Sequence, residues 1–317
     1  MNKTITNKPS TDERIWAVLA HLSTMALGIG LPLPILGWSQ NRRKSNYASF
    51  QSLQALGYQT LGYTIWILIT LVVVVIQTLD MMTTLIAAAE SGTDYDSLTQ
   101  IVMGRHFLIT FGLFALYFAL PFIAAIACAL GIEFRYPIIG NRLARYLGYD
   151  QVRVSEERTW LMEENEDRWV AATGHFAIII VFWGLLAPIF AWAMLGKRSL
   201  FLKFQSIQAV VYQAGTTLLY VMAGFLYMFG VVVFIVTIGF EGGSRLNTLS
   251  GLIGVIIFFG SLLVSMFIIM TIPLLHILGQ WAGYRVLKGE MYRYPIIGKL
   301  IERRLSMKTN TIEETLT

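Results

Sequence analysis

The chain has 317 residues, of which 56% are hydrophobic and 14% are charged, and its mean hydropathy is +0.61. A soluble domain of this length could not bury so much apolar surface, so the composition excludes an ordinary soluble protein and indicates an integral membrane protein. The net charge of +5 comes from Lys and Arg residues in short runs between apolar segments. This pattern is typical of anchoring beside anionic lipid headgroups, and we expect no nucleic-acid binding.

Six apolar segments follow one another along the chain, and each is long enough to reach across a bilayer, which takes about 20 helical residues. Backbone polar groups in hydrocarbon must be satisfied within the protein, which leaves helices for runs of this length. We therefore predict an all-α integral membrane protein. The segments comprise residues 15–38, 53–79, 106–130, 169–194, 207–239 and 249–283.

The second half of the chain repeats the first. Residues 14–59 align without a gap with residues 168–213, most closely as FQSLQALGYQ at 50–59 and FQSIQAVVYQ at 204–213, and the hexapeptide RYPIIG occurs at 135–140 and 293–298. Each copy must be one structural unit of the same kind, here three helical segments. We expect a polar N-terminal tail (1–11), a first repeat (12–147), an acidic linker (148–165), a second repeat (166–305) and a C-terminal tail (306–317).

The positive charges favour one topology over another. Six crossings would turn the second copy over and divide the 24 Lys and Arg residues almost evenly between the two sides. If the first segment of each copy is re-entrant or sharply broken, only Arg105 and Arg245 lie outside, as the positive-inside tendency favours. The breakers are present, because GIGLPLP at 28–34 and Gly184 with Pro188 can turn a chain. We therefore expect four crossing helices in the cytoplasmic membrane, with the basic loops and both termini cytoplasmic; an inverted repeat of six crossings is the alternative.

The start of the second helix of each copy has a polar stripe. At about 100° per residue, its members fall on one face of a helix. One interpretation is interhelical hydrogen bonding, in which glutamine holds packed helices together; the other is a polar vestibule that passes or holds a polar substrate. The stripe comprises Gln51, Gln54 and Tyr58 in the first copy and Gln205, Gln208 and Tyr212 in the second.

His21 and His175 occupy equivalent positions on the two broken segments. As ionisable groups in apolar segments they are candidates for proton transfer or for a carboxylate contact. A neutral histidine bonded to a backbone carbonyl explains their presence equally well.

The RYPIIG motif begins a short basic segment after the third helix of each copy. Pro137 and Pro295 suit a first helical position, and apolar residues follow at helical spacing, so we expect short basic helices on the membrane surface. Tyr136 and Tyr294 would lie at the level of the lipid headgroups, with their hydroxyl groups in contact with water. Arg135 and Arg293 complete this candidate interfacial motif.

The sequence offers no catalytic or metal site. Its four histidines and one cysteine are dispersed, and no nucleophile accompanies a base and an orienting acid. We expect no enzymatic activity and no cofactor.

The order of several motifs along the chain resembles that of the Tic-twenty-like membrane family, named for a component of the chloroplast inner-envelope import translocon. These motifs are an Arg followed by a His in the first segment, Pro and Trp at its end, a basic loop, F-x-x-x-QA at the start of the second helix, and GEMYRYP from Gly289 to Pro295 at the end of the third. The resemblance implies two tandem copies of a three-segment domain. It also implies a structural or translocation-related role beside other membrane subunits. The alternatives are a small-molecule or ion transporter, or an accessory subunit of an energy-converting assembly.

Overall fold

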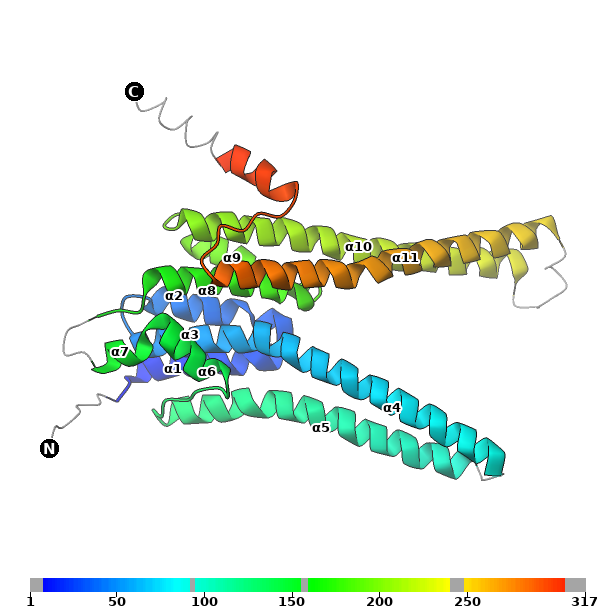
Figure 1. The fold of residues 1–317 in the computed structure, drawn as a ribbon, viewed down its shortest axis with the longest axis horizontal. Helices are drawn as coiled ribbons and strands as arrows, with labels where there is room; N and C mark the ends of the chain where they lie inside the picture. The colour runs from blue at the N-terminus through cyan, green and yellow to red at the C-terminus, as the bar shows by residue number, and fades with distance from the viewer. Residues whose placement is uncertain (1–7, 92–94, 155–158, 240–247, 306–317) are drawn as a thin grey trace.

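The computed structural model describes residues 8–91, 95–154, 159–239 and 248–305, and within these ranges all regular structure is helical (Figure 1). Four helices in the described part are long and apolar enough to cross a membrane: Asn46–Ser91, Leu98–Ala129, Leu200–Ile238 and Leu249–Leu287. They correspond to the second and third predicted segments of each copy, and each is longer than predicted at one end or at both. The predicted all-α membrane tandem repeat is confirmed.

The two units are built from corresponding elements in the same order. The first contains α1 (Thr11–Leu22), η1 (Ser23–Gly30), α2 (Pro32–Asn41), α3 (Asn46–Gly57), a π-helical turn η2 (Tyr58–Gly62), α4 (Tyr63–Ser91), α5 (Tyr95–Ala129) and α6 (Ile139–Leu147). After α7 (Tyr149–Val154), the second contains α8 (Glu163–Phe176), η3 (Ala177–Ile179), η4 (Trp183–Leu185), α9 (Leu186–Leu195), α10 (Leu200–Ile238) and α11 (Leu249–Leu287). Residues 297–305 form a last helix, the counterpart of α6.

The first apolar segment of each unit is broken, as its glycines and prolines predicted. The backbone φ becomes positive at Leu27 (51°) and at Phe182 (65°), and the chain turns from α1 into α2 and from α8 into α9. Glycine is required beside each turn. A Cβ on Gly30 would come within 1.8 Å of the Ser23 carbonyl oxygen, and one on Gly184 within 2.0 Å of that of Ala177.

The two units have the same orientation. The hairpins α4–α5 and α10–α11 extend in one direction from a bundle of short helices that contains α1, α2, α3, α8 and α9 (Figure 1). The largest buried cluster lies within this bundle and joins the two units through residues such as Leu53, Leu143 and Trp169. The two units therefore share one orientation within the fold, and the four-crossing membrane topology stays a prediction.

The basic helix α6 differs from the predicted surface helix. It occupies the expected residues, but Leu143, Ala144 and Leu147 are buried in the protein core. Tyr146 donates a hydrogen bond to the Leu287 carbonyl at the end of α11. The apolar face of α6 is therefore covered by α3 of its own unit and α8 of the second unit instead of by lipid.

Candidate functional site

The polar stripe, the histidine and the RYP motif of each unit meet in one buried cluster. In the first unit His21 comes from α1, Gln51 and Gln54 from α3, and Tyr136 from the segment before α6; all four are at most 1% exposed. We call these residues, with Tyr58 and the Phe134 carbonyl, the first clamp. Residues more than 80 positions apart in the chain are thereby held at one point.

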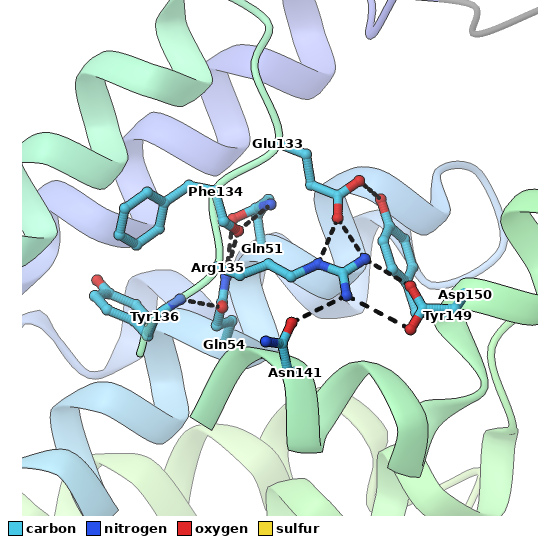
Figure 2. A network of polar contacts seen from close by, with 9 residues as sticks. All are labelled: Gln51, Gln54, Glu133, Phe134, Arg135, Tyr136, Asn141, Tyr149 and Asp150. Atoms are coloured by element: carbon cyan, nitrogen blue, oxygen red, sulfur yellow. Dashed lines mark hydrogen bonds and ion pairs between the residues drawn. The ribbon is translucent and has the colours of Figure 1, made fainter. Parts of the chain in front are cut away.

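The hydrogen bonds of the first clamp determine each other's direction. The carbonyl of Phe134 can only accept, so the amide nitrogens of Gln51 and Gln54 face it, at 3.1 and 3.0 Å. The Gln51 Oε1 atom therefore faces His21 and accepts from Nε2 at 2.9 Å. This leaves Nδ1 as an acceptor for the Tyr136 hydroxyl at 3.0 Å. Finally, Gln54 Oε1 accepts the Tyr136 backbone N–H at 2.7 Å, as Figure 2 shows.

The second unit reproduces this arrangement. The second clamp consists of His175, Gln205, Gln208, Tyr212 and Tyr294, with the Tyr292 carbonyl. His175 lies 3.0 Å from the Tyr294 hydroxyl and 3.2 Å from Gln205 Oε1. Both glutamine amides donate to the Tyr292 carbonyl at 3.1 Å, and Gln208 Oε1 accepts the Tyr294 N–H at 3.1 Å.

Stacked tyrosines close each clamp. The rings of Tyr58 and Tyr136 stack at 4.2 Å, and those of Tyr212 and Tyr294 at 4.0 Å. The expected position of Tyr136 and Tyr294 at headgroup level is wrong: they are 1% and 2% exposed, because stacking and the bond to histidine hold each ring inside the protein. The hydroxyl of Tyr58 donates to the Tyr117 carbonyl, which ties the clamp to α5.

The RYPIIG backbone is shaped to fit the glutamine. Ile138 and Ile296 both have positive φ, 65° and 68°. A Cβ on Gly140 would lie 2.4 Å from Gln54 Oε1, and one on Gly298 would lie 2.9 Å from Gln208 Oε1. The repeated glycine is therefore a packing requirement of the clamp.

Arg135 points away from the clamp into a polar network (Figure 2). Its guanidinium pairs with Glu133 at 2.7 Å and with Asp150 at 2.6 Å, and it also donates to Asn141. Arg293 instead pairs with Glu302 at 2.7 Å, in the helix that follows it. Pro137 and Pro295 precede the two strained isoleucines and lie exposed.

These contacts agree with interhelical hydrogen bonding, since the side-chain polar groups of the two stripes have partners within the fold. The histidines are bonded to glutamine and tyrosine side chains instead of to the expected backbone carbonyl. Both lie outside the four long apolar helices, and burial lowers the pKa of each imidazole to about 4, so each is neutral near pH 7. Among the described residues, no three His, Cys, Asp or Glu side chains lie together as a metal site would require.

The acidic linker leads into a contact between the units that the sequence did not reveal. Arg42, at the end of α2, is 8% exposed and pairs with Glu166 at 3.1 Å and Asp167 at 2.7 Å, on the first turns of α8. Trp38 donates to the same Glu166 carboxylate at 3.1 Å. Burial raises the pKa of Glu166 to about 7, although Arg42 and Trp38 act to lower it. The linker residues 155–158 and both tails, 1–7 and 306–317, lie outside the described residues, as does Arg245.

Sequence reasoning also missed Gln59 and Gln213, which end the repeated stretches FQSLQALGYQ and FQSIQAVVYQ. Gln59 donates to the Ala20 carbonyl and to Ser23, and Gln213 donates to the Gly174 carbonyl, so each binds near the end of the first helix of a broken segment, α1 or α8. Gln59 also lines a cavity of about 250 Å³ between the broken segments, beside Thr24 and Trp183. The repetition itself was the signal that could have identified them.

The buried clamp occurs twice, and a protein-family model also matches the chain twice. The model is that of MamF_MmsF, the magnetosome magnetite crystal formation protein family, and it matches residues 12–143 and 166–301. The chain belongs to the MamF_MmsF family. No curated protein and no solved structure was found to match the chain.

Membership of the MamF_MmsF family overturns the resemblance to the Tic-twenty-like family, which is wrong. The motifs that carried the resemblance are mainly residues of the clamps: the histidine, the QA motif and the RYP motif. They fix how three helical segments pack, and packing of this kind does not specify a function. The expectation of protein translocation loses its support with that resemblance.

Proposed function

We propose that this protein is a non-catalytic structural component of the membrane in which magnetite crystals form. The family description supplies the setting, and the clamps supply the physical argument. In each unit the conspicuous repeated polar groups, Gln51 and Gln54 or Gln205 and Gln208, are buried and occupied by hydrogen bonds within the fold. Such groups stabilise a shape, and a site for chemistry would need some of them free for a substrate.

The clamps bear on how the protein would lie in the membrane. They join the base of each hairpin to its broken segment, on the side where the basic loops lie, so the positive-inside tendency favours a cytoplasmic position for both clamps. Helices α10 and α11 have 39 residues each, or about 58 Å at 1.5 Å per residue, which exceeds the hydrocarbon thickness of about 30 Å. We infer that the hairpins project beyond the bilayer and give the protein a defined height above it.

Deletion and complementation in a magnetosome-forming host test this role. Loss of the protein is expected to change the size or number of magnetite crystals in electron micrographs, and the wild-type chain should restore them. Purified protein in vesicles loaded with an iron-sensitive dye should add no iron flux over protein-free vesicles. Normal crystals in the deletion strain would refute the structural role, and protein-dependent flux would show that the protein is a transporter.

A further inference from the structure

A cavity of about 250 Å³ lies where the two broken segments meet. Thr24 and Gly28 from η1 and Gln59 from the π-helical turn η2 form one side of it. Ile180 and Trp183 of the second unit form the other side. No residue of either clamp lines this cavity, so the clamps do not account for it.

Two buried polar atoms of the lining residues have no hydrogen-bond partner among the described residues. They are the hydroxyl oxygen of Thr24, which is fully buried, and Oε1 of Gln59, which is 3% exposed. The amide nitrogen of Gln59 donates to the Ala20 carbonyl and to Ser23, so the orientation of the amide is fixed and Oε1 is left as an acceptor. Buried polar atoms without partners destabilise the protein unless a further molecule binds them.

The corresponding place in the second unit is much smaller. Gln213, the counterpart of Gln59, also has an Oε1 atom without a partner in the described part of the chain, but the space beside it is only about 10 Å³, enough for one water at most. The counterpart of Thr24 is the apolar Ile178. Gln213 lies in the regular helix α10, whereas Gln59 lies in a π-helical turn, a feature frequent at functional sites. These differences indicate a binding site formed around the first unit.

Water alone does not suit this cavity. A space of about 250 Å³ would hold several waters, and each would need about two to four polar partners. Apart from Thr24 and Gln59, the lining side chains are aliphatic or aromatic, and none is charged. A molecule with an apolar body and one hydroxyl group suits both parts of the lining. Its O–H can donate to Gln59 Oε1, and its oxygen can accept from the Thr24 hydroxyl.

The cavity borders an apolar surface. Leu27, Phe182 and Trp183 lie at or beside the two backbone turns and are exposed, although they are large and apolar. Leu27 and Trp183 also line the cavity. Such a surface is typical of contact with lipid, so a molecule dissolved in the membrane would meet the cavity directly.

We propose that this cavity binds a neutral molecule from the membrane that has an apolar body and one hydroxyl group, held between Thr24 and Gln59. The bound molecule contacts both units and stabilises the place where their broken segments meet. This site follows from the cavity alone and does not depend on the role proposed above.

A matched pair of probes tests the contribution of the hydroxyl group. 4-Fluorophenol and fluorobenzene have similar shapes, and fluorine NMR measures the binding of each to the purified protein in lipid nanodiscs. Thr24→Val removes the Thr24 hydroxyl at nearly constant size, so it should weaken the binding of 4-fluorophenol about fivefold and leave that of fluorobenzene unchanged. Thr217→Val, beside the small space of the second unit, is the control and should affect neither probe.

A larger wall residue tests the position of the site. Ile179→Phe should lower the affinity for both probes about tenfold, and size-exclusion chromatography checks that this variant folds. Mass spectrometry of lipids extracted from the purified wild-type protein should detect a neutral hydroxylated lipid that Ile179→Phe loses.

Three results would overturn the proposal. The first is an equal effect of Thr24→Val on both probes, which would show that the hydroxyl group is not recognised. The second is an unchanged probe affinity and lipid content in Ile179→Phe. The third is the absence of probe binding to the wild-type protein, which would indicate that only water occupies the cavity.

Discussion

At the residue scale, each clamp depends on side chains whose polar atoms all form hydrogen bonds within the protein. Gln51 Oε1 accepts from both His21 and Gln54, so removing one member leaves others buried without a partner. An unsatisfied buried donor or acceptor costs about 1–3 kcal/mol, more than the bond itself contributes. The clamp is therefore expected to respond to small changes in shape as well as to loss of its polar groups.

Gly140→Ala tests this sensitivity, since the new Cβ would lie 2.4 Å from Gln54 Oε1 and 2.8 Å from Arg135 Cβ. We expect a loss of about 1–3 kcal/mol of stability, seen as a lower midpoint of thermal aggregation in mild detergent. Gly298→Ala should act in the same way in the second unit. Gly112→Ala is the control, because nothing lies within 4 Å of its Cβ; an equal loss there would show that the clamp is not the cause.

The clamp histidines predict a pH dependence. Burial lowers the pKa of His21 and His175 from 6.5 to about 4, so between these values the unfolded chain binds more protons than the folded one. Stability from this source is complete above about pH 6.5 and is lost as the pH falls towards 4. Glu166 acts in the opposite direction: its pKa of about 7 exceeds the ordinary value of 4.5, so protonation in this range favours the folded state.

The two effects can be separated by comparing thermal midpoints at pH 7 and pH 4.5. His21→Gln with His175→Gln should reduce the loss on acidification, even if the variant is less stable at pH 7. Glu166→Gln should make the loss larger. Equal losses in all three proteins would contradict the assignment of these groups.

The sequence predicted the members of the clamp but not their partners. The stripe of Gln51, Gln54 and Tyr58 follows from helical spacing, and repetition singled out His21. The bond between His21 and Tyr136 joins residues 115 positions apart, and no local pattern contains that contact. The predicted position of Tyr136 was wrong for this reason. An aromatic residue beside a basic segment suits the membrane surface, but here the Tyr58 ring and the His21 imidazole, both distant in sequence, bury it.

At the element scale, the broken segments are the decisive feature. Pro32, Pro34 and the glycines predicted the break in the first unit, because these residues disfavour a continuous helix. The partner of α6 could not be predicted in the same way. Helical spacing identified the apolar face of α6, but both lipid and protein suit such a face. Only the fold, which places α6 against α3 and α8, shows that protein covers it.

Gly30→Ala and Leu27→Gly should have opposite effects on the first break. The new Cβ at Gly30 would overlap the Ser23 carbonyl oxygen, so we expect poorly folded protein. Leu27 has φ 51° and ψ −140°, a conformation suited to glycine, and its side chain is 48% exposed. Leu27→Gly should therefore be tolerated, with an unchanged or higher thermal midpoint. A well-folded Gly30→Ala protein in size-exclusion chromatography would argue against the tight turn.

At the scale of the whole molecule, the repeat becomes two units that meet where α8 of the second packs on α3 of the first and where α2 packs on its counterpart α9. The distribution of Lys and Arg favours a membrane topology in which both units have the same orientation, and that topology stays a prediction. The contact between the units was not predictable, because neither the packing of Trp169 against Gly57 nor the ion pair of Glu166 with Arg42 is repeated. The counterparts of Trp169 and Gly57 are Ile15 and Val211, and those of Glu166 and Arg42 are Asp12 and Gly196. Where α8 packs on α3, differences between the copies mark where the units meet.

Labelling of single cysteines in oriented membranes tests the like-oriented, four-crossing arrangement most directly. In a Cys128→Ala background, the exposed positions Arg43→Cys and Lys197→Cys report on the bases of the two units, and the exposed Glu90→Cys and Leu249→Cys report on the outer ends of the hairpins. We expect a membrane-impermeant maleimide to label the first pair from one side only and the second pair from the other. Labelling of Arg43→Cys and Lys197→Cys from opposite sides would contradict the arrangement, because it would require an odd number of crossings in each unit.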